Sequence, residues 1–153
     1  MKTRCFIFGL FIILFLSVTA VYAQEGGAFS SYLVGTYDMR NAYTVFQIIN
    51  PTGTGIDVYV AFFDDNENPL ICKKYNFSHN RLIEIDVRKL ELKPKFGFGV
   101  VKIVSLLDKH PFPGLVGFQR QYFAKMSVTE SNLASVPGKI LDDELKIIMG
   151  ICK

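Results

Sequence analysis

The residue types that most often carry chemistry are scarce in this chain, which has 153 residues, two histidines, three cysteines and no tryptophan. His79 lies in a polar turn and His110 in a loop, and neither has the spacing to a cysteine or a second histidine that a zinc site requires. The chain has no nucleophile elbow, phosphate loop or haem-attachment motif. Gly97-Phe98-Gly99 lacks the third glycine of a dinucleotide-binding loop. We therefore predict no catalytic residues, no cofactor and no resident metal.

Polar residues suggest three weaker sites. Asp64, Asn66 and Asn68 alternate as the oxygen ligands of a calcium loop do, but proline follows them where the loop needs glycine, and a polar hairpin turn explains the same residues. Glu84 and Asp86 could converge with other carboxylates, which leaves a hydrolase as an alternative to a binding protein. Asn76-Phe77-Ser78 matches the N-glycosylation sequon, which matters only in a eukaryotic secretory pathway.

The N-terminal residues are typical of an export signal. Met1–Arg4 carries two positive charges, Phe6–Leu16 is apolar, and Val21-Tyr22-Ala23 has the pattern that a signal peptidase recognises. We expect a signal peptide at residues 1–23 with cleavage after Ala23, export to the periplasm, cell surface or medium, and no stable membrane span afterwards. An uncleaved anchor is the alternative, because the apolar stretch is just long enough to cross a bilayer.

Cleavage would also change the charge and the cysteine count. The 17 basic residues of the chain would fall to 15 against 14 acidic ones, which is too even a balance to predict a nucleic-acid partner. Cys5 would leave, and Cys72 and Cys152 would remain as a pair that predicts a disulfide in an oxidising compartment. Such a bridge would stabilise the fold by about 4 kcal/mol in the chain-entropy model. Two unpaired buried thiols are the alternative.

The chain after the signal is dominated by short strands between turns. The clearest is Ile56–Phe63, in which apolar side chains recur at period two. Gly97 and Gly99 indicate a bulge or a close backbone approach, and Val87–Leu92 could make one helical turn. We expect strands over residues 29–37, 43–49, 56–63, 70–75, 81–87, 96–107 and 115–123. About seven strands at this spacing predict an all-β, antiparallel β-sandwich of immunoglobulin-like architecture over residues 24–126.

Residues 127–153 are expected to form a loop and an apolar segment that packs on the sandwich. Ser127–Ser135 is polar and indicates a loop or an extended arm. One helical face farther on would carry four apolar residues, which are Leu141, Leu145, Ile148 and Cys152. Three acidic residues, Asp142–Glu144, come early in this segment and suit the N-terminal end of a helix. We favour a short helix, with an edge strand over residues 146–151 as the alternative.

Part of the chain resembles a known kind of module. The motifs that carry the resemblance are Gly35–Arg40, Thr44–Thr52, Val60–Asp64 and Asn68–Leu70. They look like the opening of small bacterial extracytoplasmic β-sandwich modules, in which an asparagine turn joins two strands and a phenylalanine–aspartate strand runs into a polar hairpin. The layout is also similar to that of the sensory rhodopsin transducer proteins. The resemblance implies a β-sandwich with a ligand-binding or interaction role, and no catalytic residues to transfer.

These features lead us to expect an exported, non-enzymatic β-sandwich that binds another envelope protein or copies of itself. Two alternatives stay open. One is a structural subunit of a surface filament or layer, in which residues 147–151 or 29–35 complete the sheet of a neighbour. The other is a glycan-binding or small-ligand-binding module that uses exposed tyrosine and phenylalanine side chains.

Overall fold

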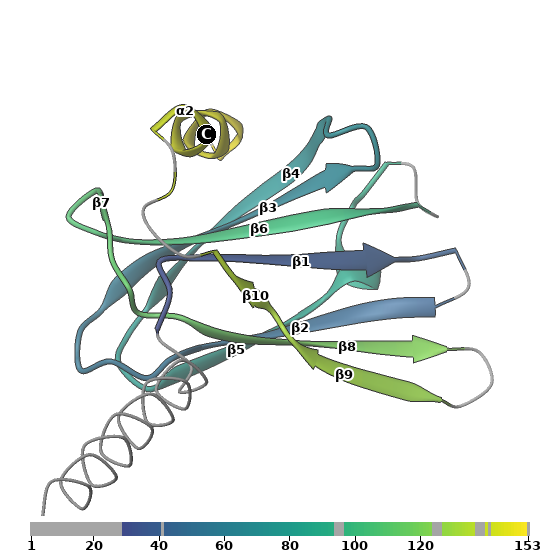
Figure 1. Ribbon diagram of the computed structural model, residues 1–153, viewed down its shortest axis with the longest axis horizontal. Helices are drawn as coiled ribbons and strands as arrows, with labels where there is room; N and C mark the ends of the chain where they lie inside the picture. The colour runs from purple at the N-terminus through teal and green to yellow at the C-terminus, as the bar shows by residue number, and fades with distance from the viewer. Residues whose placement is uncertain are drawn as a thin grey trace, which may run out of the picture.

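The chain folds into two antiparallel sheets that pack face to face (Figure 1). The computed structural model describes residues 29–40, 42–93, 97–123, 127–136, 140 and 142–152. The expected antiparallel β-sandwich is confirmed. The signal peptide that we expect at residues 1–23, with cleavage after Ala23, lies outside the described residues. None of the described helices is long and apolar enough to cross a membrane.

The larger sheet has the strand order β10-β1-β6-β3-β4, and the short strand β7 pairs with β6. Its strands are β1 (Tyr32–Asp38), β3 (Ile56–Asp64), β4 (Pro69–Phe77), β6 (Phe98–Leu107), β7 (His110–Pro111) and β10 (Ala134–Ser135). All of these pairings are antiparallel, and β4 lies at the free edge.

The smaller sheet has the order β5-β2-β8-β9. Its strands are β2 (Ala42–Asn50), β5 (Arg81–Asp86), β8 (Val116–Phe123) and β9 (Val128–Asn132). The 3-10 helix η1 (Val87–Lys89) follows β5, where the sequence predicted a single helical turn. The chain ends in the helix α2 (Asp142–Ile151), which confirms the helix favoured over an edge strand. Leu141, expected on its apolar face, lies outside the described residues.

The main core lies between the sheets and follows the alternation read from the sequence. Val58, Val60 and Phe62 of β3 point inward and are fully buried. Burying one such side chain contributes about 1.5–3 kcal/mol. The close backbone approach expected at the glycines is confirmed at Gly99, because any side chain there would collide with the carbonyl oxygen of Phe63.

Residues 127–135 differ from the loop or arm that we expected, because they form β9 and β10. β9 extends the smaller sheet and β10 extends the larger one, so this segment crosses between the layers at one open edge of the sandwich. With the two-residue strand β7, it brings the described part of the chain to ten strands, against about seven expected. All residues of β9 and β10 are exposed, so these strands carry no apolar alternation and depend on backbone pairing.

Leu133 is the buried residue of this crossing segment. Its side chain enters the main core, and its backbone N–H donates to the Gly117 carbonyl at 2.9 Å. A Cβ atom added at Gly35 or at Gly117 would lie 2.5 Å from the Leu133 methyl groups. Two glycines therefore make the space that one leucine fills at the open edge of the sandwich.

Truncating Leu133 should therefore destabilise the whole sandwich. We expect Leu133→Ala to lower the free energy of unfolding by about 2–5 kcal/mol, because it leaves a cavity between Gly35 and Gly117. The matched control is Val128→Ala, in the same segment but 52% exposed, which should stay within about 0.5 kcal/mol of wild type. Urea denaturation measures both, and equal effects would contradict this account of the crossing segment.

A second apolar layer lies on the outer face of the larger sheet, under α2 (Figure 1). The sheet contributes Tyr32, Tyr59, Ala61, Phe63, Val104 and Leu106, and the C-terminal segment contributes Ile140 and Ile148. Leu145 and Cys152, two of the residues predicted on the apolar face of the helix, pack against this layer. The larger sheet is therefore covered on both faces.

Two further interactions hold α2 in place. A disulfide joins Cys72 of β4 to Cys152, just beyond the helix, with the Cα atoms 4.9 Å apart, and it confirms the predicted pairing. Near the start of the helix, Glu144 Oε1 accepts hydrogen bonds from Tyr32 Oη at 2.5 Å and Lys102 Nζ at 2.7 Å. Burial raises the pKa of Glu144, but the hydrogen bonds from Lys102 and Tyr32 lower it more, so the net pKa lies below its usual range.

The Glu144 contacts predict that α2 is less stable in acid. Since the folded-state pKa of Glu144 is below the unfolded value of about 4.3, its ionised form stabilises the fold above that pH, and the effect is lost as pH falls through the folded pKa. We expect Glu144→Gln to be less stable than wild type at pH 7 and to approach it near pH 3. Thermal unfolding across this range measures the difference, and a gap that does not depend on pH would contradict the assignment.

Candidate functional site

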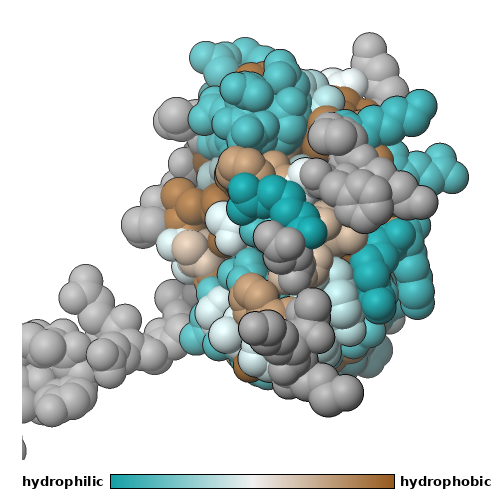
Figure 2. Space-filling view, turned by 90° about the vertical axis from the view of Figure 1, so that its right-hand side faces the viewer, coloured by the Kyte–Doolittle hydropathy of each residue, from teal (hydrophilic) through white to brown (hydrophobic). Residues whose placement is uncertain are grey.

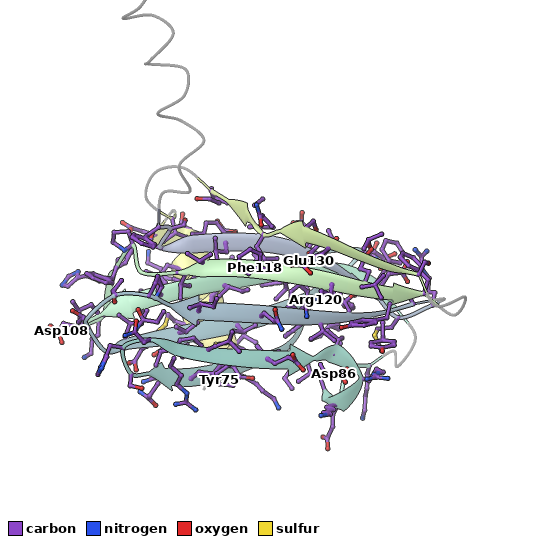
Figure 3. The ribbon with its side chains drawn as sticks, turned by 90° about the horizontal axis from the view of Figure 1, so that it is seen from below. Tyr75, Asp86, Asp108, Phe118, Arg120 and Glu130 are labelled. Carbon is purple, nitrogen blue, oxygen red and sulfur yellow. A yellow bond between two sulfur atoms is a disulfide. The ribbon has the colours of Figure 1, made fainter. Side chains whose placement is uncertain are left out.

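The outer face of the smaller sheet has no helix over it in the part of the chain that the structure describes. We call it the exposed face. Strand parity places on it Tyr43, Val45, Gln47 and Ile49 of β2, Leu82, Glu84 and Asp86 of β5, Val116, Phe118, Arg120 and Tyr122 of β8, and Val128, Glu130 and Asn132 of β9. Figure 3 looks onto it, with Phe118, Arg120, Glu130 and Asp86 labelled.

Polar side chains across the middle of the exposed face are paired with one another. Arg120 Nε lies 2.7 Å from Glu130 Oε2, across the β8–β9 pair. Gln47 donates to Glu84 at 3.2 Å across the β2–β5 pair. The Arg88 guanidinium lies 2.7 Å from Asp86 and lowers the pKa of that carboxyl through hydrogen bonding. These groups already have partners, so a ligand covering the face would not have to supply a separate counter-charge for each.

An aromatic row crosses one end of the exposed face. The rings of Tyr43 and Tyr122, a directly opposed cross-strand pair, stack with centroids 4.6 Å apart and planes 5° from parallel. The Arg88 guanidinium lies 3.6 Å from the Tyr43 centroid. Because Tyr122 covers one side of the Tyr43 ring, Arg88 must cover the other. The row is therefore a preformed, rigid ridge of the kind that loses little conformational entropy on binding.

The opposite end of the exposed face is apolar. Leu82 is 52% exposed, and it lies in the same cross-strand row as Ile49 and Val116. Phe118, one row nearer the centre, is half-buried and also lines a groove of about 220 Å³ that reaches Leu133. The exposed face thus combines an apolar end, a paired polar middle and an aromatic ridge.

The composition of the exposed face differs from that of the rest of the surface. Of the described residues that point outward there, none is a lysine, and its cation is arginine. By contrast, Lys74 and Lys102 lie on the outer face of the larger sheet, where Lys74 pairs with Asp57 and Lys102 with Glu144. Protein–protein interfaces are enriched in tyrosine, phenylalanine and arginine and depleted in lysine.

The three weak calcium candidates lie in a hairpin turn, as their alternative explanation expected. Asp64 Oδ1 accepts from the backbone N–H groups of Asn66 and Asn68 at 2.9 and 2.7 Å, and Oδ2 accepts from the Asn68 side chain at 2.9 Å. These hydrogen bonds, the Asn68 side chain first, lower the pKa of Asp64. Both carboxylate oxygens of Asp64 therefore accept hydrogen bonds from within the turn. In the described residues, no group of three histidine, cysteine or acidic residues is placed to hold a metal.

The other residues singled out from the sequence lie on different elements of the structure. His79 is in the exposed turn between β4 and β5, and His110 begins β7. Glu84 and Asp86 share the exposed face but are engaged by Gln47 and Arg88. Asn76, the sequon asparagine, is exposed on β4, and its amide donates to Asp57.

A second hollow, of about 370 Å³, lies at the end of the sandwich where β1 and β3 finish. Figure 2 looks onto this end, where hydrophilic and apolar side chains are interspersed. Arg40 covers the Phe98 ring at 4.0 Å and pairs with Asp38. Burial, then the charges of Asp64 and Asp65, raise the pKa of Tyr37 to about 12. Four acidic residues and one arginine line the hollow, but the arginine and the aspartates make local contacts.

No protein-family model matches the chain, and no curated protein matches it significantly. One solved structure, the crystal structure of Thermotoga maritima 1070, is similar in fold, with a TM-score of 0.56 and 13% sequence identity. The alignment covers 75% of this chain and 100% of that chain. At this identity the similarity shows the fold alone.

The hairpin geometry predicts a stability effect at Asp64 that is independent of calcium. We expect Asp64→Ala to lower the melting temperature at neutral pH, because the backbone N–H groups of the turn lose their acceptor. Because the folded pKa of Asp64 is depressed, the difference from wild type should shrink as pH falls below about 4. Differential scanning fluorimetry with and without millimolar Ca²⁺ measures both, and a calcium-dependent rise that Asp64→Ala abolishes would contradict the turn assignment.

Proposed function

We propose that the protein is an exported, non-enzymatic β-sandwich that binds a protein partner in the cell envelope through the exposed face of its smaller sheet. The observation that carries the proposal is the difference between the outer faces of the two sheets. α2 covers the outer face of the larger sheet and is fastened there by a disulfide, whereas the described residues place no helix and no outward-pointing lysine on the outer face of the smaller sheet.

Export is supported by the N-terminal sequence pattern and by the disulfide. A basic start, an apolar run and small residues before position 24 favour a signal peptide. The Cys72–Cys152 bridge is of the kind that persists in oxidising compartments and is rare in reducing ones. The resemblance of residues 35–70 to extracytoplasmic β-sandwich modules fits the same location and a binding role.

The filament-subunit alternative is weakened by the positions of its two proposed donor segments. Residues 147–151 belong to α2, which lies over its own sheet. Residues 32–35 belong to β1, which is paired with β6 on one side and with β10 on part of the other. Neither segment is a free strand that could complete the sheet of a neighbour.

A glycan-binding platform fits the exposed face less well than a protein partner. Sugars stack on open aromatic faces, but both faces of the Tyr43 ring are covered, by Tyr122 and Arg88. Phe118 is half-buried. The exposed apolar residues at the far end, led by Leu82, are aliphatic and suit the apolar core of a protein interface.

The binding proposal is tested by placing a charge at either end of the exposed face. We expect Leu82→Lys and Val128→Lys each to weaken capture of the partner from envelope extract by about tenfold or more, because a lysine would be desolvated in the interface. Ile147→Lys is the matched control, since Ile147 is 55% exposed but lies on α2, away from the smaller sheet.

Circular dichroism should be unchanged in all three variants, because each replaced side chain is more than half exposed. Quantitative pull-down with the immobilised protein gives the relative affinities. Loss of binding in Ile147→Lys with retention in the other two would move the interface to α2. Equal retention in all three would refute binding through either surface.

A further inference from the structure

We propose that helix α2 is a redox-controlled cover, closed over the larger sheet when Cys72 and Cys152 are joined and open when they are reduced. The proposal goes beyond partner binding and does not depend on it, because it concerns the opposite face of the molecule. It rests on how the two apolar layers are divided, on the size of the helix and on the place of the disulfide.

The two apolar layers are separate. The cluster between the sheets takes its residues from the sheets and the segments connecting them, and α2 contributes none of its described residues to it. Among the described residues, the apolar side chains of the helix pack against the second layer, on the outer face of the larger sheet. Removing α2 from the surface would therefore leave the main core intact, and the helix can open as a unit of its own.

The helix has little stability of its own, so its place depends on its contacts with the larger sheet. It has ten residues, which is below the length at which isolated helices are stable in water. Ile148 is its one fully buried side chain among the described residues, and the neighbouring Ile147 is 55% exposed. Closure therefore depends strongly on the covalent link and on the Glu144 contacts with Tyr32 and Lys102.

The disulfide fastens the end of the helix at a place that a reductant can reach. Cys152 follows the last helical residue, and Cys72 lies on β4, the free edge strand of the larger sheet. Both cysteines are only partly buried. The bond spans 80 residues of sequence, so its reduction frees the C-terminal end of the chain from a distant strand.

The switching step is a thiol–disulfide exchange with a dithiol reductant. One thiolate of the reductant attacks Cys72 or Cys152 and breaks the bond between them, which forms a mixed disulfide and releases the other cysteine as a thiolate. The second thiol of the reductant then displaces the protein sulfur. Two electrons and two protons pass to the protein, which becomes a dithiol, and the reductant becomes a disulfide.

Opening would uncover an apolar strip of the larger sheet. Tyr59, Ala61 and Phe63 of β3 point to the face beneath α2 and are buried in the closed form. Before oxidation the chain would therefore carry a complete sandwich with an uncovered second layer. Disulfide formation would close that layer as the last step of folding.

Hydrogen exchange on the folded protein tests the cover. The oxidised protein is compared with the same protein treated with a phosphine reductant, and with Cys72→Ser/Cys152→Ser. We expect the amides of α2 to exchange about tenfold faster or more without the bridge. The amides of β2 and β8 should stay within about twofold, and binding of an apolar dye should rise.

Two further variants sharpen the result. In the reduced protein, Glu144→Gln should speed exchange in α2 again, because it removes the charge that Lys102 and Tyr32 contact, whereas Ile147→Ala should change it little. Unchanged protection of α2 after reduction would overturn the proposal. So would simultaneous loss of protection in α2, β2 and β8, since the helix would then be part of one cooperative unit with the sandwich.

Discussion

The larger sheet is apolar on both faces, and this constraint determines much of the structure. Along β3, Val58, Val60 and Phe62 face the smaller sheet, while Tyr59, Ala61 and Phe63 face the other way. A strand with two apolar faces must be buried on both, and a two-layer sandwich covers one. A third layer is needed, and α2 with Ile140 provides it. The disulfide and the Glu144 contacts then fasten this helix, which has one fully buried side chain among its described residues.

The smaller sheet is apolar on its inner face and mixed on its outer face, so its outer face does not have to be buried. On β5, Ile83 and Ile85 point to the core, and Leu82, Glu84 and Asp86 point outward. The charged groups of this face satisfy one another across strands, as with Arg120 and Glu130. An open sheet face tolerates water on its polar rows, so the apolar residues left on it are free to contact a partner. In the function that we propose, the covered larger sheet would serve stability and the outer face of the smaller sheet would serve recognition.

The sequence predicted the strands where burial imposes a period of two. The seven expected strands all form, with ends shifted by a few residues, because each has at least one face in an apolar layer. β9 and β10 were missed because they are exposed on both sides and are held by backbone pairing with β8 and β1. Leu133, between two polar strands, was the available signal, but a single leucine in a polar segment does not distinguish a core residue from a surface one.

The exposed face could be predicted only in part, for a reason of register. Alternation shows that Glu84 and Asp86 share a side, but not which residues lie beside them. Tyr43 meets Tyr122 because β2 pairs with β8, which is far away in the sequence, and slipping that register by one residue would turn one ring toward the core. Cross-strand pairs therefore depend on long-range pairing that single-strand patterns do not encode. The disulfide was easier to predict, since the expected loss of Cys5 with a leader leaves two cysteines, and two cysteines can pair in only one way.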